Sequence, residues 1–382
     1  MSTTDLRGTD PRPTGPTDPT DPTDPESRTR RTRRGVAALS AALLGLTLSA
    51  CAGATAAQES ASGKTVFRYQ GGTGTVSYPE LAEDLGYFED VELEWIGDVT
   101  GGPASIQAAV TGETEFGSAF NGAIAKLQST GAPVTSVISS YGEDDETFAG
   151  YYTLEGSGIT SARDLIGKKV GLNTLGAQYE TVLKEWLARE GLTPEEVAQV
   201  ELVVVPPVNL EQTLREGQID VAALSGVIKD KALDRGGIDT LVDDTELYGG
   251  FAYGTYILRD DVIAKNRDAV QDFVQGTARA IRWAQTTPVD EVRDRFRSII
   301  EKRHHTGETT DLVPYWKSAG ISVPGGVIQE KEISVWVDWL EQDGQVDDGA
   351  LTVDDLYTNE FNPYANGEFA PDAGPDGEEA AS

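Results

Sequence analysis

The stretch TGGPASIQAAVTGETEFGSAFNGAIAKLQSTG, residues 100–131, decides the fold class of this chain. Its first part predicts a helix that begins at Pro103 and ends before Gly112, because proline favours the first turn of a helix and glycine the position past its end. Residues 115–118 predict a short strand, and a second helix follows and ends near Gly131. The stretch is thus a helix–strand–helix unit, which is the repeating element of an α/β protein.

A second unit of this kind follows 105 residues later, where Gly217 and Gly236 repeat the spacing of Gly112 and Gly131. Short apolar runs alternate with amphipathic segments as far as residue 258, which predicts mixed sheets with helices on both faces. The chain therefore looks like two similar α/β halves with hinge crossings near 141–152 and 247–255. Beyond them it is predicted to be mainly helical, at 266–285, 288–303, 310–317 and 329–342.

The first fifty residues predict an export signal. A cluster of arginines at 28–34 precedes the uncharged apolar stretch 35–50, which ends in small residues. The sequence Leu48-Ser49-Ala50-Cys51 resembles the bacterial lipobox, in which the cysteine thiol receives a diacylglycerol. We therefore expect a lipid on Cys51, the only cysteine of the chain, and anchoring to the outer face of the cytoplasmic membrane. An uncleaved membrane anchor over 35–58 is the alternative, and Sec and twin-arginine export both stay open.

The charge of the chain limits its partners. The net charge is −32, and residues 1–50 contribute +1, so the rest of the chain carries −33. Nucleic acid is excluded as a typical partner, because binding to the phosphate backbone needs a basic face. Strong acidity keeps an exported protein soluble, and we expect a monomer. The segment 65–369 is long enough for two domains.

Motifs for enzyme chemistry are weak. The loop at 72–77 has the context of a dinucleotide fingerprint, but Ser77 stands where the third glycine belongs, so we expect a loop that binds a ligand through backbone N–H groups at a helix N-terminus. His304 and His305 are adjacent and have no second cysteine or G-x-S-x-G elbow beside them, and we expect a solvated helix end. The acidic run 143–146 is predicted to be a solvated loop that could meet a cationic ligand. We predict no catalytic residue, no metal and no cofactor, and hence a protein that is not an enzyme.

An ordered set of motifs runs through the body of the chain: Leu81-Ala82 with Gly86-Tyr87-Phe88, GG at 101–102 with AAVTG at 108–112, EFG at 115–117, GAPV at 131–134, DLIGKKVG at 164–171, GL at 191–192, LREGQIDV at 214–221 and DLYTNEF at 355–361. This set resembles the solute-binding proteins of ABC importers in the nitrate/sulfonate/taurine and thiamine-precursor group. The resemblance implies a two-lobed α/β periplasmic-binding-protein fold of type II, with mixed sheets flanked by helices and two hinge crossovers. It also implies a solute held between the lobes and delivered to permease and ATPase subunits.

These expectations divide the chain into five parts. They are a signal peptide with a disordered N-region at 1–50, a lipid-anchored linker at 51–64, lobe 1 with the C-terminal helices at 65–146 and 253–369, lobe 2 at 147–252, and an acidic disordered tail at 370–382.

Ligands of open α/β sheets lie beyond the carboxyl ends of the strands, and the resemblance implies the same loops. The predicted ligand-binding residues are Gly72, Thr73, Gly74, Thr75, Tyr78, Thr100, Gly101, Gly102, Ser118, Phe120, Asn121, Tyr141, Asn173, Thr174, Gly176, Gln178, Asn209, Ser225 and Tyr248.

The class of ligand stays open between two alternatives. An aliphatic sulfonate, taurine or a nitrate-like anion would be held by helix N-termini and hydroxyls, since the loops at 70–75, 97–102, 120–122 and 173–178 hold no Arg or Lys. The aromatic side chains near the loops suit a flat heteroaromatic solute, such as a pyrimidine or a flavin. An exported enzyme acting on a pyrimidine-type substrate is the alternative function, and it would need a reactive His or Cys in the cleft.

Overall fold

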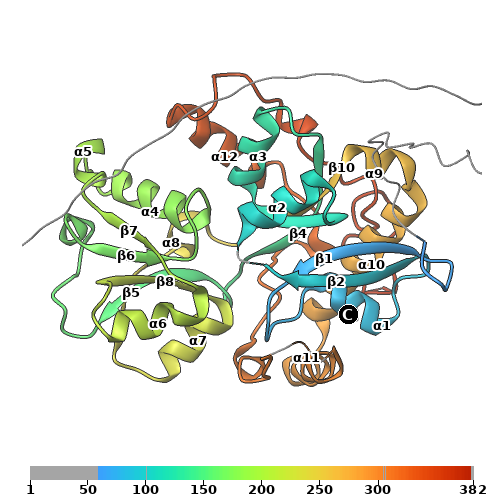
Figure 1. The fold of residues 1–382 in the computed structure, drawn as a ribbon, viewed down its shortest axis with the longest axis horizontal. Helices are drawn as coiled ribbons and strands as arrows, with labels where there is room; N and C mark the ends of the chain where they lie inside the picture. Colours follow the sequence, from blue (N-terminus) through green and yellow to red (C-terminus); the bar gives the residue numbers. More distant parts are fainter. Residues whose placement is uncertain (1–58, 100, 304, 306, 380–382) are drawn as a thin grey trace, which may run out of the picture. The chain divides into compact units, whose positions relative to one another are not determined.

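The computed structural model describes residues 59–99, 101–303, 305 and 307–379 (Figure 1). Cys51, the predicted signal peptide, Thr100 and His304 lie outside the described residues. In the part of the chain that is described, no helix combines the length and the apolar character needed to cross a bilayer.

The first sheet region contains the N-terminal strands and one late strand. Two strands are parallel neighbours, β1 (Thr65–Gly71) and β2 (Val91–Asp98). The long strand β10 (Phe251–Arg259) lies between β3 (Phe116–Phe120) and β4 (Val134–Glu143) and is antiparallel to both. Every residue of β10 is buried, as expected for a central strand covered on both faces. The N–H of Glu115 donates to the carbonyl of Arg68 at 3.0 Å, which links β1 to the start of β3.

The helices of this region belong to three parts of the chain. They are α1 (Tyr78–Leu85), α2 (Gly102–Thr111), α3 (Asn121–Ser129), α9 (Asp260–Lys265), α10 (Arg267–Thr286), α11 (Val289–Arg303) and α12 (Lys331–Gln342), with short 3₁₀ turns η2 (Val313–Tyr315), η3 (Pro324–Gly326) and η4 (Val353–Asp355). The main core lies where α1, α10 and α11 pack against the strands, around Phe67, Phe116 and Phe273.

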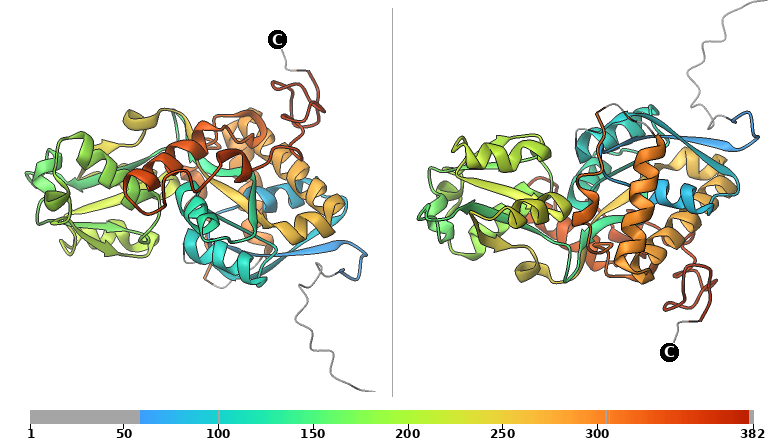
Figure 2. Two further views of the ribbon diagram at one scale, coloured as in Figure 1. Left: turned by 90° about the horizontal axis from the view of Figure 1, so that it is seen from above. Right: turned by 90° about the horizontal axis from the view of Figure 1, so that it is seen from below.

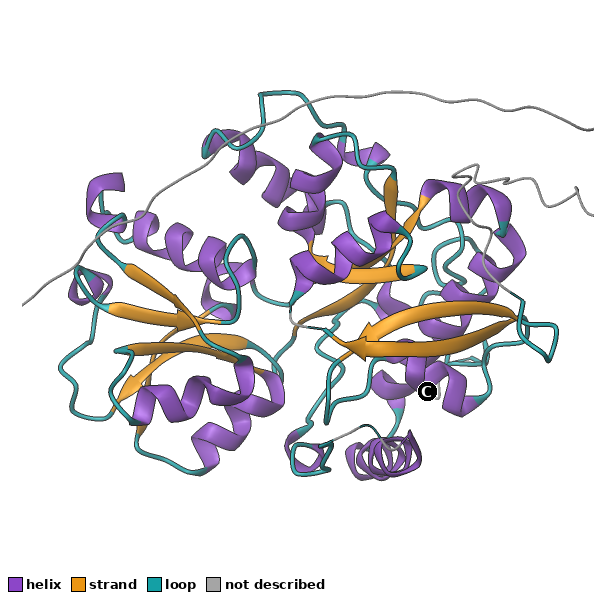
Figure 3. Cartoon of the chain, viewed as in Figure 1, coloured by secondary structure: helices purple, strands orange, loops and turns teal. Residues whose placement is uncertain are grey.

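The second sheet has five strands in the order β7-β6-β8-β5-β9. They are β5 (Ala149–Leu154), β6 (Lys169–Leu172), β7 (Glu201–Val204), β8 (Val221–Ser225) and β9 (Ile238–Asp243), and β5 is antiparallel to β8 and β9. Figure 3 shows helices on both faces of this sheet. They are η1 (Ala162–Leu165), α4 (Gln178–Arg189), α5 (Pro194–Val197), α6 (Pro207–Arg215), α7 (Gly226–Asp234) and α8 (Thr245–Tyr248).

The predicted repeat is present in the structure as α2–β3–α3 and α6–β8–α7. The four glycines of the repeat, Gly112, Gly131, Gly217 and Gly236, all have φ between 66° and 84°. This left-handed conformation ends a helix and is strained for residues with a side chain. The glycine spacing therefore marked real helix ends in both halves.

Three expected features differ in the structure. The segment 310–317 forms only the turn η2, in which Pro314 cannot donate a helical hydrogen bond. Residues 59–64, expected as part of a flexible linker, form a turn in which Lys64 Nζ donates to the carbonyl of Phe88 at 2.9 Å. The described part of the tail, 370–379, packs beside α10 (Figure 2), because Arg282 donates to the carbonyl of Ala373 at 2.7 Å and Ala373 is buried.

Candidate functional site

A cavity of about 180 Å³ lies between the two sheet regions. Its wall from the first region consists of Gly102, Ser118, Ala119, Phe120 and Tyr141, and its wall from the second consists of Asn173, Ala177, Gln178 and Tyr179. These residues come from β3, β4, the start of α2, the loop between β6 and α4, and the first turn of α4. Six of them are predicted ligand-binding residues: Gly102, Ser118, Phe120, Tyr141, Asn173 and Gln178.

Two close approaches of the backbone shape the first wall. An added Cβ at Gly254 of β10 would overlap the ring of Tyr141, so a glycine there lets this ring lie across the strand. An added Cβ at Gly102 would lie 2.9 Å from Cβ of Ala119, so α2 can begin directly on β3. The two approaches leave the ring of Tyr141 and the hydroxyl of Ser118 on the cavity wall. Ser118 Oγ lies 2.6 Å from Oγ of Ser140.

The second wall carries hydrogen-bonding groups at the start of α4. Asn173 Oδ1 is buried and has no hydrogen-bond partner among the described residues. The hydroxyl of Tyr179 donates to Ser225 Oγ at 2.6 Å, and Gln178 Nε2 donates to Asp244 Oδ2 at 3.2 Å. Because buried polar atoms nearly always find partners, the unpartnered oxygen of Asn173 is a candidate acceptor for a ligand on this wall.

The cavity wall is uncharged. None of the described residues that line it is Asp, Glu, Lys or Arg. Burial raises the pKa of Tyr179 to about 12, and burial together with the neighbouring Tyr179 raises the pKa of Tyr141 as well. Both tyrosines therefore remain neutral phenols at physiological pH, and the cavity offers aromatic rings, hydroxyls and amides.

A pair of buried acids lies behind this wall. Glu143 and Asp244 are each 1% exposed. Burial, and then the hydrogen bond and charge of Asp244, raise the pKa of Glu143 to about 11. Glu143 was expected in a solvated loop, and its burial corrects that expectation. Asp145 and Glu146 of the same run are exposed, while Asp144 accepts from Ser318 Oγ at 2.7 Å.

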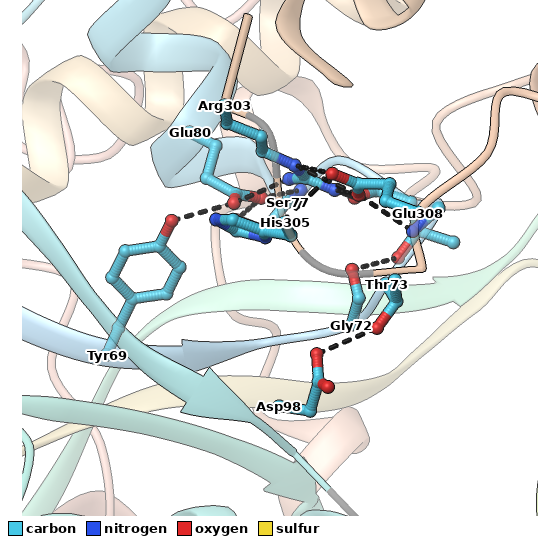
Figure 4. A network of polar contacts seen from close by, with 11 residues as sticks. Tyr69, Gly72, Thr73, Ser77, Glu80, Asp98, Arg303, His305 and Glu308 are labelled. Carbon is cyan, nitrogen blue, oxygen red and sulfur yellow. Dashed lines mark hydrogen bonds and ion pairs between the residues drawn. The ribbon is translucent and has the colours of Figure 1, made fainter. Parts of the chain in front are cut away.

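The loop after β1 lies in a different environment (Figure 4). The N–H of Gly74, expected to bind a ligand, donates to Glu308 Oε1 at 2.9 Å. Arg303 binds Glu308, donates to Glu80 Oε1 at 2.7 Å and donates to the carbonyl of Thr75 at 2.6 Å. Thr73 Oγ1 donates to Asp98 Oδ1 at 2.7 Å. The polar groups of this loop are thus already bonded within the protein.

The loop nevertheless borders a second, larger cavity. Thr73 and Gly74 line a space of about 470 Å³ together with residues of α6, α7 and the segment 307–312. His305, expected at a solvated helix end, instead stacks on Trp95 with ring centroids 3.8 Å apart. It does not line the 180 Å³ cavity.

Three predicted ligand residues belong to the core. The hydroxyl of Tyr78 donates to the carbonyl of Ala319 at 2.6 Å. Asn121 Nδ2 donates to the carbonyls of Ala252 and Glu332 at 3.2 and 2.9 Å. The hydroxyl of Tyr248 bonds to Glu185 while its ring packs against neighbouring aromatic residues. None of the three lines the 180 Å³ cavity, although Asn121 Oδ1 has no hydrogen-bond partner among the described residues.

The remaining predicted residues that the structure describes line neither of these two cavities. An added Cβ at Gly101 would lie 3.4 Å from Thr174 Cγ2, so these two loops touch across the lobes. Ser225 accepts from Tyr179, as described above. Gly72, Gly176 and Asn209 are exposed, and Thr75 Oγ1 donates to the carbonyl of Gly72 at 3.3 Å.

Sequence reasoning missed Ala119, Ala177 and Tyr179 as lining residues. Tyr179 directly follows the predicted loop 173–178, in the first turn of α4, so its position beside that loop was an available signal. Asp244 had no comparable signal, because its partner Gln178 lies 66 residues away in the chain.

Comparisons with known proteins agree with this architecture. The family model described as NMT1/THI5 like matches residues 80–291. The periplasmic aliphatic sulphonate-binding protein of Escherichia coli is 17% identical with a TM-score of 0.58, and the match covers 76% of this chain and 96% of that one. The periplasmic nitrate-binding protein of Synechocystis PCC 6803 is 13% identical with a TM-score of 0.60, covering 78% and 87%. The predicted periplasmic-binding-protein fold is confirmed.

Two curated relatives are named as an enzyme, 4-amino-5-hydroxymethyl-2-methylpyrimidine phosphate synthase. The one from Candida albicans (strain WO-1) is 29% identical over 222 residues, 54% of this chain and 63% of the relative. The one from Schizosaccharomyces pombe is 24% identical over 241 residues, 60% of this chain and 65% of the relative. The chain thus spans less than two thirds of either relative.

These names contradict the prediction that the chain is not an enzyme. That prediction rested on the lack of a reactive His or Cys in the cleft loops. Such a lack says nothing of catalysis by other side chains, and it was too narrow a basis for the conclusion.

Proposed function

The chain belongs to the NMT1/THI5-like family, and we propose that it binds a small, flat heteroaromatic solute of the pyrimidine class in the 180 Å³ cavity. One observation carries the proposal: the cavity combines the aromatic side chains of Phe120, Tyr141 and Tyr179 with the unpartnered acceptor Asn173 Oδ1. An aminopyrimidine offers a flat ring for the aromatic side chains and an N–H donor for the acceptor. The names of the two curated relatives point to the same chemical class.

The same features weigh against the other ligand classes. Nitrate and an unsubstituted alkanesulfonate offer only acceptors, so neither would provide a donor for Asn173 Oδ1, and no Lys or Arg lines the wall. A flavin is drug-sized, and sites for such ligands measure roughly 300–1,000 Å³. The cavity volume of about 180 Å³ suits a single ring.

The proposed role is that of an extracytoplasmic receptor, which captures the solute between its lobes and delivers it to the permease and ATPase of an ABC importer. The arginine cluster, the apolar stretch and the lipobox-like end at Cys51 support export and lipid anchoring. The negative charge of the remaining chain supports a soluble, monomeric receptor domain.

Thermal unfolding of the purified full chain tests the choice of ligand. We expect 4-amino-5-hydroxymethyl-2-methylpyrimidine to raise the Tm, because a ligand at a hundred times its Kd stabilises the native state by about 2.7 kcal/mol. Alkanesulfonates, nitrate and riboflavin at equal concentrations serve as matched comparisons and are expected to leave the Tm unchanged. A shift with a sulfonate and none with the pyrimidine would reverse the assignment.

Enzymatic activity on a pyrimidine-type substrate is the second candidate function, favoured by the names of the two relatives. It would use the same cavity, so the ligand assay extends to it directly. Incubating the protein with the bound compound and analysing it by mass spectrometry distinguishes the two functions. Unchanged ligand after many binding cycles supports the receptor, and a product that accumulates with time supports the enzyme.

Lipid anchoring is tested at Cys51. We expect the wild-type chain expressed in bacteria to incorporate labelled palmitate and to fractionate with membranes, and Cys51→Ser to do neither, because the thiol is the acceptor of the lipid. The variant Ser49→Ala keeps the thiol and is the matched control. Membrane association of Cys51→Ser at the wild-type level would favour the uncleaved anchor.

A further inference from the structure

The two crossings between the sheet regions meet at the buried acid pair. Glu143 ends β4, where the first crossing begins, and Asp244 follows β9, where the second begins. The N–H of Ala149 donates to Asp244 Oδ1 at 2.9 Å, and the N–H of Asp244 donates to the carbonyl of Ala149 at 3.1 Å. Asp244 therefore ties the second crossing to the end of the first.

Asp244 also reaches the ligand cavity. Gln178, a buried residue of the cavity wall, donates from Nε2 to Asp244 Oδ2 at 3.2 Å. An ionised carboxylate only accepts hydrogen bonds, so the nitrogen end of the amide must face Asp244. The carbonyl oxygen of Gln178 is thereby left for other partners. With Asn173 Oδ1, it makes the second wall rich in acceptors.

The surroundings of the pair determine which acid holds the proton. Asp244 accepts N–H groups from both Ala149 and Gln178. Glu143 Oε1 accepts only from the hydroxyl of Tyr253, at 3.2 Å, and its Oε2 has no donor among the described residues. Burial raises the pKa of both acids, and the hydrogen bond and charge of Asp244 raise the pKa of Glu143 further. The N–H groups that Asp244 accepts favour its ionised form, so Glu143 is the acid of the pair that more readily takes up a proton.

We propose that Asp244 is a positioning residue for the cavity: its carboxylate accepts the hydrogen bond of Gln178 Nε2 and thereby orients the amide so that the carbonyl oxygen serves the ligand. Asp244 touches no ligand itself and acts through Gln178. This arrangement selects ligands that donate hydrogen bonds. The inference rests on the proposed function for the choice of ligand probe.

Exchanging Asp244 for asparagine tests the role. The new side chain would keep an acceptor for Ala149 and gain an amide that donates to Gln178, so the Gln178 amide would turn and present its N–H₂ to the cavity. We expect the wild type to bind 4-amino-5-hydroxymethyl-2-methylpyrimidine at least tenfold more tightly than its 4-oxo analogue by calorimetry. Asp244→Asn is expected to reduce that ratio at least tenfold, because the oxo group accepts from the turned amide.

Asp243→Asn is the matched control, since it removes a neighbouring carboxylate whose Oδ1 accepts from Thr245 and Glu246 and not from Gln178. Its amino-to-oxo ratio is expected to stay within twofold of the wild type. A purely structural role of Asp244 would weaken both ligands equally. An amino-to-oxo ratio in Asp244→Asn within twofold of the wild type would overturn the proposal.

A measurement without ligand keeps the test independent of the proposed function. With selective ¹⁵N-glutamine labelling, and Gln178→Ala for assignment, we expect the side-chain N–H₂ of Gln178 to exchange with water at least tenfold more slowly in the wild type than in Asp244→Ala. Equal exchange rates would reject the positioning role. Slow wild-type exchange without binding of either pyrimidine would retain that role and reject the pyrimidine assignment alone.

Discussion

Replacing Arg303 by methionine is expected to lower the free energy of unfolding by about 3–5 kcal/mol, the usual effect of removing one partner from a buried ion pair. The Arg303 side chain is 12% exposed and lies between the carboxylates of Glu80 and Glu308, of which 7% and 3% are exposed (Figure 4). Without the guanidinium, both carboxylates stay buried without their positive partner and keep only neutral donors, such as the N–H of Gly74 for Glu308 and the hydroxyl of Tyr69 for Glu80. Urea denaturation at pH 7 measures the loss.

The loss of stability in Arg303→Met is expected to depend on pH, because it arises from ionised carboxylates. Burial alone would raise the pKa of Glu308, but hydrogen bonding and charge from Arg303 outweigh it and lower the pKa. A lowered folded-state pKa contributes stability above the unfolded value of about 4.3, and this stability is lost as the pH falls through the folded value. The penalty of Arg303→Met is therefore expected to be largest near pH 7 and smaller at a pH low enough to protonate the Glu308 carboxyl.

Arg297→Met is the matched control for this substitution. Arg297 pairs with Asp294 on the same helix, and the two side chains are 41% and 76% exposed. Exposed pairs contribute roughly 0–1 kcal/mol, so this variant is expected to unfold almost like the wild type. If both variants lost a similar free energy of unfolding, the buried cluster would contribute no more to stability than the exposed pair.

Replacing Glu143 by glutamine is expected to stabilise the protein increasingly as the pH rises. The folded-state pKa of Glu143, about 11, lies far above its unfolded value. The wild type therefore holds one proton more when folded than when unfolded. The contribution of Glu143 to the free energy of unfolding is therefore fully present below about pH 4.3. Above that pH the free energy of unfolding falls by about 1.4 kcal/mol per pH unit until the pH reaches the folded-state pKa. Glutamine keeps a donor for Asp244 and an acceptor for Tyr253 and does not titrate, so this slope disappears.

Denaturation of both proteins at pH 5.5 and pH 8.5 measures the difference. Over these three pH units the stability of Glu143→Gln relative to the wild type is expected to rise by roughly 4 kcal/mol. Asp244 and Tyr253 face the same site, and Glu143 is among the groups that shift their pKa values. Glu146→Gln, at an exposed acid of the same crossing, is the control and should retain the wild-type slope. Parallel pH profiles for the wild type and Glu143→Gln would place the proton elsewhere.

Much of the fold was predictable because its signals are local. Pro103 lies in the first turn of α2, and Gly112 follows its last residue. In the second half, the left-handed glycines Gly217 and Gly236 follow helix ends in the same way. Helix ends and strand periodicity depend on residues that are neighbours in the chain, so both can be predicted from a single sequence. The segment at 310–317 failed as a helix for an equally local reason, because Pro314 lies within it.

The candidate site was predictable only to the level of loops. The end of β3 and the connection from β6 into α4 supply most of the cavity wall, as the position of strand ends implies. The predictions could not tell which aromatic residue faces a ligand: Tyr141 lines the cavity, whereas Tyr78 and Tyr248 belong to the core. A tyrosine beside a strand end has the same local signature in both cases.

The sequence by itself determined the two α/β halves and the ends of many helices. Only the tertiary structure decided that the Gly74 loop bonds Glu308, that Glu143 and Asp244 are both buried, and that the Gln178 amide bonds Asp244. The reason is physical. Backbone conformation follows from adjacent residues, whereas the partner of a buried polar atom comes from whichever distant segment the fold places against it, here 66 residues away for Gln178 and 234 for Gly74.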